Sequence, residues 1–472
     1  MHEINNINKR LRTIKHFSNY FLVALIIGVL TGIIVLAANG YDIDRSTGQV
    51  IQNGILLVET DPRGASVSIN GQEESARTPA KYPIPAGRYE VMIDKPGYRA
   101  WTSQVEIFGS SVNWLYYPAL VPESIETRTV AAVDNLNFVA NSLQRNAVIT
   151  SLASNPRSLT LYDVGASELT PQPVVIPDSV FFLEDNAPIG KLSFVEWSKT
   201  GRHILLRYEV NNQDDLVLVD LEDAGRTTNL DRLYNRDFDS VEFTDDESRS
   251  FLLSKGSLFE ADLNQVTISS PLDTDVTDMH EHQGKVWVIK NTGTATELTL
   301  LGSPEVVLVS VPGVARVVSI DDWEGTENVI IDTGDQVLVY KSPSLDSIEK
   351  NVVSKLLELN EHTNTTTSPN GRFVALHNEA DTLVYDLDNL NTYMVGVGAD
   401  QQIRWLDGHR LSYDANGQLF IVDFDGNNDY QIAGYDSAFP AMVDREFDAI
   451  YTIAPRSVNR QLLLRQSDLE LN

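Results

Sequence analysis

The first hydrophobic feature of the chain is a long apolar run near its start. No charged side chain occurs between Phe17 and Tyr41, and residues 20–38 read YFLVALIIGVLTGIIVLAA. A helix rises about 1.5 Å per residue, so this run can cross a hydrocarbon core of about 30 Å. The pattern therefore predicts a transmembrane signal-anchor helix at residues 19–40. A cleaved signal peptide is the alternative, but the run exceeds the usual length of about 7–15 residues for its apolar region.

A shorter region after this run shows the two-residue alternation of half-buried strands. Residues 66–70 and 89–93 alternate between apolar and polar, and Asn70-Gly71 is a strong hairpin-turn signal. Alternation lets one face of a sheet be buried while the other meets water. We therefore expect a small β-sandwich at residues 54–108, joined to the helix by a polar tether at residues 41–53.

The remaining chain repeats a pattern of a strand, a polar turn and two further apolar strands. Examples are VEWSKTGRHILL at residues 195–206 and TSPNGRFVAL at residues 367–376, and the latter is followed by TLVYDL at residues 382–387. Repeats begin about every 40–45 residues, which is the length of one four-stranded propeller blade. We expect a β-propeller of seven or eight blades at residues 127–472, preceded by a connector at residues 109–126.

Two segments of this region carry specific expectations. The last blade has little chain beyond Asp468 for an outer strand, whereas residues 127–133 form a strand-like run ahead of the first blade. A closed ring leaves no unpaired strand edge, so we expect residues 127–133 to complete the last blade. Residues 347–360 follow a helical period, and the pattern leaves open an inserted helix or an outer strand of a blade.

Charge and composition narrow the location and the chemistry. The chain carries 36 Lys+Arg against 66 Asp+Glu, a net charge of −30 that argues against nucleic-acid binding. It contains no cysteine, which excludes disulfides, thiol nucleophiles and Cys-ligated metals. Four basic residues, Lys9, Arg10, Arg12 and Lys15, precede the apolar run, and such flanks stay in the cytoplasm. We therefore expect a cytoplasmic basic tail at residues 1–18 and an all-β ectodomain outside the cell membrane, behind a single span.

Few residues form a pattern with known chemistry. Residues 423–429 (DFDGNND) alternate oxygen side chains as calcium loops do, but they lack the Gly and Glu of an EF-hand and fit a tight hairpin turn. His280 and His282 would share one strand face as a metal pair, but without a third ligand an exposed polar turn is favoured. Paired carboxylates in expected turns indicate an acidic, solvated surface: Asp214-Asp215, Asp245-Asp246 and Asp321-Asp322.

The chain also lacks the signatures of several enzyme classes. It has no Gly-x-Ser-x-Gly elbow, no His-Glu-x-x-His and no phosphate-binding Gly-Lys-Ser/Thr. We therefore assign no catalytic, cofactor-binding or metal-binding residue and expect no cofactor.

The sandwich region resembles the PEGA domain family over about residues 53–108. The matching features are Gly54, Pro62, Gly64-Ala65, Val67–Gly71, Thr78-Pro79, Pro85–Tyr89 and Pro96–Tyr98. Ala76-Arg77 departs from the family, which often has Gly just before Thr-Pro. The resemblance implies an extracytoplasmic β-sandwich of surface-associated bacterial and archaeal proteins, without agreed catalytic residues.

The repeats resemble TolB-like and WD-type propeller repeats. Residues 197–204 and 368–375 stand where those families have a Trp-Ser-Pro-Asp-Gly-Lys turn, and residues 419–426 match the next hairpin. The resemblance covers roughly residues 127–472 and is sharp in three blades. The repeats near residues 141–168 and 279–302 are degenerate.

These expectations favour a membrane-anchored, extracytoplasmic binding or scaffold protein of the cell envelope. It would engage a protein or glycan through the propeller and the PEGA-like domain. The alternative is an exported propeller enzyme that acts on a glycan as a hydrolase or lyase, which carboxylates converging in the central funnel would favour. In the connector, Trp114, Tyr116 and Tyr117 are expected to pack at a domain seam, with an exposed aromatic patch as the alternative.

Overall fold

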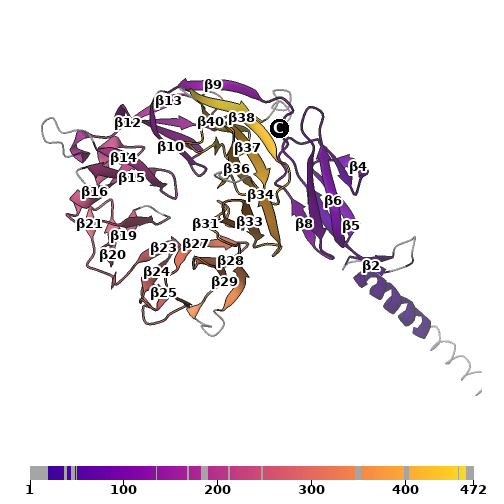
Figure 1. The fold of residues 1–472 in the computed structure, drawn as a ribbon. Coiled ribbons are helices and arrows are strands. Elements are labelled where there is room, and N and C mark those ends of the chain that lie inside the picture. Colours follow the sequence, from indigo (N-terminus) through magenta and orange to yellow (C-terminus); the bar gives the residue numbers. More distant parts are fainter. Residues whose placement is uncertain are drawn as a thin grey trace, which may run out of the picture. The chain divides into compact units, whose positions relative to one another are not determined.

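The structure of the chain, a computed structural model, forms two compact units, one of residues 1–124 with 466–472 and one of residues 125–465 (Figure 1). The described residues are 20–36, 40–43, 48, 50–133, 135–166, 169–181, 190–210, 213–245, 248–345, 352–397, 403–454 and 457–463.

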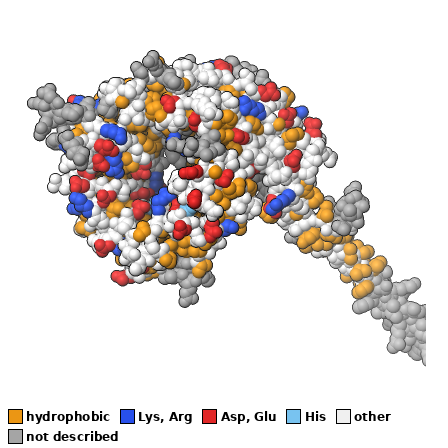
Figure 2. Space-filling view, viewed as in Figure 1, with side chains coloured by type: hydrophobic (Ala, Val, Ile, Leu, Met, Phe, Trp, Pro, Cys, Tyr) orange, Lys and Arg blue, Asp and Glu red, His pale blue; other side chains and the backbone are white. Residues whose placement is uncertain are grey.

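Residues 20–36 form a helix whose surface is covered with hydrophobic side chains (Figure 2). Within the described residues, none of the helices combines the length and the apolar character that a membrane crossing needs. The predicted cytoplasmic tail at residues 1–18 lies outside the described residues, as do residues 19 and 37–39 of the predicted span.

The first unit contains two four-stranded sheets after the helix. The first sheet has the order β1-β2-β5, and β8 pairs with β2; the second has the order β4-β3-β6-β7. The strands of the first sheet are β1 (Tyr41–Ile43), β2 (Val50–Val58), β5 (Ala80–Pro85) and β8 (Val112–Leu115). Those of the second are β3 (Ser66–Ile69), β4 (Gln72–Arg77), β6 (Gly87–Asp94) and β7 (Trp101–Ile107).

Side chains from both sheets form a single core, as expected for a small sandwich. Leu56 and Val58 of β2 are fully buried together with Val67 of β3 and Ile93 of β6. At the predicted turn, Asn70 and Gly71 have φ angles of 49° and 77°, the positive values that a two-residue type I′ hairpin turn requires.

One strand lies inside the segment that the sequence analysis treats as a connector. Strand β8 runs parallel to β2, pairing Leu115 with Val58, and Leu115 and Leu120 are buried in the core. The prediction of a connector is therefore wrong for these residues. Of the three aromatic side chains in the segment, Tyr117 packs edge-on against Trp101 within the unit, while Trp114 and Tyr116 are 60% and 44% exposed.

The second unit contains eight antiparallel sheets in its described residues, arranged as a ring (Figure 1). Each has four strands, except that the third sheet has five. In chain order the sheets contain β10 (Leu136–Ser142), β11 (Ala147–Leu152), β12 (Asn155–Asp163) and β13 (Pro171–Val175); β14 (Lys191–Trp197), β15 (His203–Val210), β16 (Gln213–Asp220) and β17 (Thr228–Asn229); β18 (Ser240–Phe243), β19 (Arg249–Ser254), β20 (Ser257–Asp262), β21 (Thr267–Ile268) and β22 (Asp273–Thr274); β23 (Asp278–His282), β24 (Lys285–Asn291), β25 (Ala295–Leu300) and β26 (Val309–Pro312); β27 (Arg316–Trp323), β28 (Thr326–Asp332), β29 (Val337–Lys341) and β30 (Val353–Leu357); β31 (Asn364–Thr367), β32 (Phe373–His377), β33 (Asp381–Asp386) and β34 (Thr392–Gly396); β35 (Arg404–Trp405), β36 (Arg410–Ala415), β37 (Gln418–Asp423) and β38 (Tyr430–Gly434); and β39 (Met442–Val443), β40 (Ala449–Ala454) and β41 (Ser457–Leu462) with β9 (Glu126–Ala132). Short helical turns are η1 (Asp178–Val180), η2 (Ala224–Arg226) and α2 (Leu230–Leu233).

The ring is closed by the strand that the sequence predicted for this role. Strand β9 pairs antiparallel with β41, from Ala132 opposite Ser457 to Glu126 opposite Leu462. The first and last sheets also touch directly, because the Asn141 side chain donates to the main-chain oxygen of Val443 at 3.1 Å. The expectation that this run completes the last blade is confirmed.

The structure also resolves the ambiguous and degenerate repeats. Residues 353–357 form β30, the outer strand of the fifth sheet, whereas residues 346–351 lie outside the described residues. The weakly patterned repeats near residues 141–168 and 279–302 form complete sheets with the same strand order as the others. The blade count is therefore eight in the described part of the chain.

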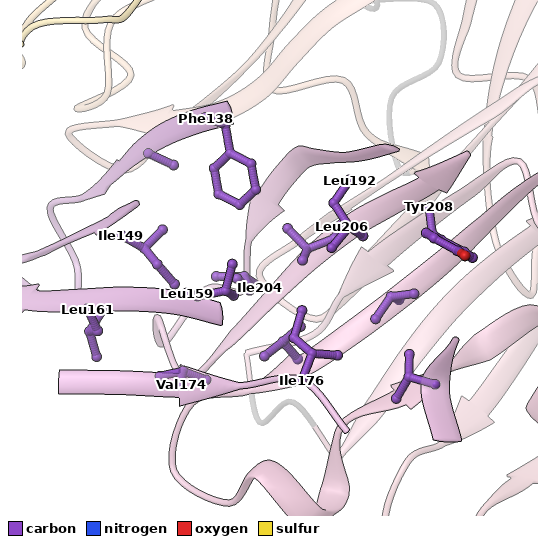
Figure 3. Close-up of a cluster of buried hydrophobic side chains, with 14 of the residues drawn as sticks. Phe138, Ile149, Leu159, Leu161, Val174, Ile176, Leu192, Ile204, Leu206 and Tyr208 are labelled. Atoms are coloured by element: carbon purple, nitrogen blue, oxygen red, sulfur yellow. The ribbon is translucent and has the colours of Figure 1, made fainter. Parts of the chain in front are cut away.

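The cores of this unit lie between consecutive sheets. Between the first two, Ile149 and Leu159 of the first sheet pack against Ile204 and Leu206 of the second, all fully buried (Figure 3). Each sheet buries both faces in this way. Middle strands consequently read as continuous apolar runs rather than as alternating ones.

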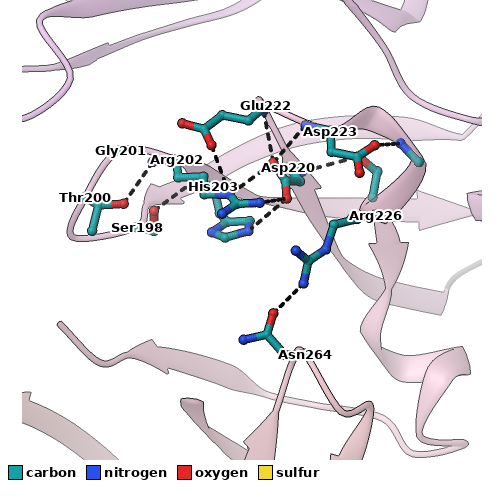
Figure 4. Close-up of polar contacts among 12 residues, drawn as sticks. Ser198, Thr200, Gly201, Arg202, His203, Asp220, Glu222, Asp223, Arg226 and Asn264 are labelled. Atoms are coloured by element: carbon teal, nitrogen blue, oxygen red, sulfur yellow. Dashed lines mark hydrogen bonds and ion pairs between the residues drawn. The ribbon is translucent and has the colours of Figure 1, made fainter. Parts of the chain in front are cut away.

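A polar network inside the second sheet explains the repeated turn sequence. Arg202 Nη2 donates to Asp220 Oδ2 at 2.8 Å, and the main-chain N–H of His203 donates to Ser198 Oγ at 2.9 Å (Figure 4). Asp220, which ends β16, also accepts from the main-chain N–H groups of Glu222 and Asp223. The Ser, Arg and Asp of the repeat therefore tie the first turn of a blade to the end of its third strand.

The same network recurs, more deeply buried, in the sixth sheet. Arg372 donates two hydrogen bonds to Asp386, at 2.9 and 2.7 Å, and the side chains are 8% and 0% exposed. We expect Arg372→Met to destabilise this sheet by about 3–5 kcal/mol, because it leaves the Asp386 charge buried and unpaired. Hydrogen exchange of β33 measures this loss.

The second sheet supplies the matched control for that substitution. The Arg202 side chain is 34% exposed, and His203 Nε2 lies 3.5 Å from Asp220 Oδ2. Arg202→Met should therefore cost β16 less protection than Arg372→Met costs β33. Equal losses would show that burial of the pair does not govern its contribution.

Candidate functional site

The first strands of the sheets lie at the inner side of the ring, and three neighbouring sheets bring charged side chains together there (Figure 1). We call this group the inner-strand cluster; its members are Glu196, Lys199, Glu242, Asp245 and Glu281. Lys199 pairs with the Glu281 carboxylate and also donates to the Glu281 main-chain oxygen at 3.0 Å. Its Nζ lies 3.5 Å from Asp245 Oδ1.

Strands β18 and β23 are linked within this cluster by Glu242. Its Oε1 accepts from the main-chain N–H of Glu281 at 3.0 Å, and Glu281 Oε1 in turn accepts from the main-chain N–H of Gly284 at 2.7 Å. The Glu281 side chain is only 2% exposed. Lys199, which follows β14 of the second sheet, thus pairs with carboxylates from the third and fourth sheets.

The environment shifts the proton equilibria of two of these carboxyl groups. Burial raises the pKa of Glu196 to about 8, with a further contribution from the neighbouring Glu242, while Lys199 opposes the shift. Burial likewise raises the pKa of Glu242 to about 7, against the hydrogen bond from Glu281 and the charge of Lys199. Near neutral pH, Glu196 therefore keeps its proton while Glu242 titrates, an arrangement suited to holding a cationic group or to proton transfer.

These shifts predict how the stability of the propeller depends on pH. A carboxyl group whose pKa is higher in the folded state stabilises the fold at low pH, and this contribution is lost as pH rises through about 7–8. We expect the temperature of half-unfolding to decrease as the pH rises from 5 to 8. The Glu196→Gln chain should show a smaller decrease. Thermal unfolding across this pH range is the measurement.

An exposed glutamate on a neighbouring strand serves as the control for this prediction. Glu209 of β15 has a side chain that is 42% exposed. Glu209→Gln should leave the pH dependence as it is in the parent chain. A Glu196→Gln chain with the parent's pH slope would contradict the assignment.

The predicted histidine pair lies on β23, the strand that also carries Glu281. His280 and His282 belong to β23 and share its partly buried face with Asp278, so the reading as an exposed polar turn is wrong. Burial lowers the pKa of His280, against the charge of Asp278, whose Oδ2 lies 3.8 Å from His280 Nε2. No cluster of three metal-ligating side chains occurs among the described residues, here or elsewhere.

The alternating oxygens of residues 423–429 face separate partners. Asp423 accepts from Asn428 Nδ2 at 2.9 Å, and Asp429 accepts from the Tyr413 hydroxyl at 2.8 and 2.7 Å. Asp425 accepts from Asn427. The segment is the turn between β37 and β38, in agreement with the favoured interpretation.

Two of the predicted carboxylate pairs lie in strands rather than in turns. Asp214 and Asp215 are in β16, and Asp321 and Asp322 are in β27. Asp246 lies outside the described residues. A cleft of about 780 Å³ is lined by the first pair with other side chains, namely Lys191, Glu209, Val210, Gln213 and Asp237.

The charged groups that line this cleft already have ionic partners. Asp215 Oδ2 lies 3.0 Å from Arg232 Nε, and Asp237 pairs with Lys255 at 2.7 Å. Ion pairing within the protein therefore accounts for the carboxylates here, and the inner-strand cluster remains the stronger candidate site.

Sequence reasoning missed the inner-strand cluster, although a signal for it was present. Glu196 and Glu242 follow Val and precede an aromatic residue in consecutive repeats, Val-Glu-Trp and Val-Glu-Phe. Equivalent repeat positions lie on neighbouring inner strands. The alignment of repeats therefore contained the information that these two side chains meet.

Comparison with known families supports the description of the first unit. Residues 53–119 match the model of the PEGA domain. The match extends past the predicted end at residue 108 and includes β8, as the core of the unit also does. A search of curated proteins returned no match.

Solved structures similar to this chain contain β-propellers. They include the β-propeller domain of Myceliophteria thermophila Cps50 (Swd1), at 10% identity, 65% coverage of this chain, 99% coverage of that chain and a TM-score of 0.41. An oligogalacturonate lyase in complex with manganese shows 11% identity, coverage of 72% and 100%, and a TM-score of 0.40. Kluyveromyces lactis Hsv2 shows 11% identity, coverage of 64% and 98%, and a TM-score of 0.39. Because these TM-scores are low, the propeller is identified from the chain itself, whose described residues form a closed ring of eight sheets.

Proposed function

We propose that this chain is a single-pass membrane protein with a cytoplasmic N-terminus. In this proposal the extracytoplasmic PEGA domain and propeller bind a protein or glycan of the cell envelope. The observation that carries the anchor is the helix of residues 20–36. Its large apolar side chains are exposed on all sides, from 49% at Ile26 to 75% at Tyr20. A helix that is apolar all round is stable when lipid or protein covers it.

The closed ring supports the binding half of the proposal. Pairing of β9 with β41 gives the last blade a fourth, outermost strand. Loops carried on such a rigid frame are suited to recognising a partner. The acidic net charge favours basic or neutral partners, with contacts that weaken as salt rises where charge contributes.

Co-purification from membranes tests this function. A tagged chain extracted in mild detergent is expected to retain a discrete envelope protein or glycan, reversibly. The matched control lacks residues 126–132 and therefore the closing strand β9. Retention of nothing, or of the same material by both chains, would contradict binding by the intact ring.

The inner-strand cluster supports a second function, cleavage of a glycan by an exported hydrolase or lyase. Glu196, which holds its proton near neutral pH, and the titrating Glu242 could act as acid and base on one substrate. Incubation of the purified chain with a glycan library tests it. Turnover that is lost in Glu196→Gln and in Glu242→Gln would replace the binding function with this one.

A further inference from the structure

Exposed apolar side chains gather at the end of the PEGA domain from which the chain leads to the helix. We call this group the apolar tip; it consists of Tyr41, Val50, Phe108 and Val112. Their exposed fractions are 40%, 67%, 51% and 51%. Phe108 and Val112 flank the loop between β7 and β8, and Tyr41 and Val50 belong to the hairpin of β1 and β2.

Main-chain hydrogen bonds hold this loop against the segment that comes from the helix. The N–H of Asn53 donates to the Gly40 oxygen at 2.7 Å, and the N–H of Ser110 donates to the Asn53 oxygen at 2.9 Å. A Cβ atom at Gly40 would lie 3.2 Å from Ser110 Oγ. Gly40 is therefore fixed directly beside the loop that carries Phe108 and Val112.

Chain length then limits how far the apolar tip can be from the helix. Gly40 is four residues beyond Leu36, the last described helical residue, and two beyond Ala38, the end of the apolar run. At about 3.6 Å per residue, Gly40 lies within about 14 Å of the former and about 7 Å of the latter. The headgroup layer on each side of a bilayer is about 5–7 Å thick. A membrane that holds the helix therefore has its headgroup layer at the level of Gly40.

The chemistry of the segment that carries Phe108 and Val112 suits that layer. No charged residue occurs from Ile107 to Pro122, although 22% of the whole chain is charged. The strong negative charge of the chain would oppose contact between its acidic surfaces and anionic lipids. An uncharged loop with one aromatic and one branched aliphatic side chain partitions into the boundary between headgroups and acyl chains.

We propose that the apolar tip inserts into the headgroup layer of the membrane that holds the helix. The PEGA domain is thereby docked on the membrane surface instead of hanging free on its tether. This inference rests on the proposed membrane anchor. It adds a second, peripheral contact and fixes which end of the domain faces the lipid.

The absence of cysteine makes single-site labelling a direct test. Phe108→Cys and Val112→Cys chains, each labelled with an environment-sensitive fluorophore, are reconstituted into vesicles that contain lipids brominated near the headgroup. Ala100→Cys is the matched control, because exposed Ala100 precedes β7 and Phe108 follows it, so the two lie about 26 Å apart along one strand. We expect several-fold stronger quenching at positions 108 and 112 than at position 100.

The outcomes separate this inference from the anchor on which it rests. Flotation of the labelled chains with the vesicles reports the anchor independently of any quenching. Chains that float but show equal quenching at all three positions overturn docking and leave the anchor standing. A blue-shifted label at position 108 that brominated lipid does not quench indicates coverage by protein, and it also overturns docking. Chains that fail to float overturn both.

Discussion

Deletion of residues 126–132 is expected to reduce hydrogen-exchange protection strongly in β40 and β41. These strands lie far away in sequence: the side chains of Thr129 and Asn459, 330 residues apart, are hydrogen-bonded. Without β9, strand β41 becomes a free edge, and Val130 and Ala131 no longer pack against the core around Tyr451. Loss of several main-chain hydrogen bonds, worth about 1 kcal/mol each, should reduce protection by about two orders of magnitude or more. Hydrogen exchange in β40 and β41, measured on the parent chain and on the chain without residues 126–132, tests this prediction.

Two point variants serve as controls for this deletion. Val130→Asp places a charge in the contact with the last sheet and should reproduce much of the loss. Arg128→Ala alters a side chain that is 60% exposed and should leave protection nearly unchanged. Unaltered exchange at residues 449–462 in the deleted chain would show that β9 does not close the ring.

Placing aspartate at Leu25, Ile26 and Val29 is expected to release the chain from the membrane. Each of these side chains is about half exposed on the helix of residues 20–36. An aspartate near the centre of a span opposes insertion by about 2.5–3.5 kcal/mol, so three together exceed what the remaining apolar residues supply. Carbonate extraction of membranes measures the effect.

Apolar replacements at the same positions separate hydropathy from side-chain shape. The Leu25→Phe, Ile26→Leu and Val29→Ile chain should remain in the membrane pellet like the parent. If the triple-aspartate chain also stays in the pellet after carbonate extraction, lipid does not surround this helix.

The repeat architecture could be predicted because the blades share one strand pattern, and the second and sixth blades also share one turn network. The Ser, Arg and Asp of the turn recur where Arg202 meets Asp220 and where Arg372 meets Asp386, so the pattern is visible in the sequence. The closing strand was predictable from the absence of an outer partner for the last repeat. The blade count was not, since two repeats keep the strands and lose the turn signature.

The misses have identifiable causes. Strand β8 is short and shows no clear alternation, and its parallel partner β2 is more than 50 residues away, so only tertiary pairing reveals it. Asp321 and Asp322 were assigned to a turn because charge pairs usually mark one, whereas the structure places both of them, partly buried, in β27. The same assumption concealed the meeting of Glu196 and Glu242, which depends on how consecutive sheets are placed around the ring.

The location of the C-terminal end tests the central claim most directly. One reporter that is active only in the cytoplasm and one that is active only outside it are fused in turn after Asn472 of the intact chain. An anchored protein with an extracytoplasmic PEGA domain and propeller predicts a silent cytoplasmic reporter and an active external one. A bright cytoplasmic reporter with an inactive external one would contradict the account.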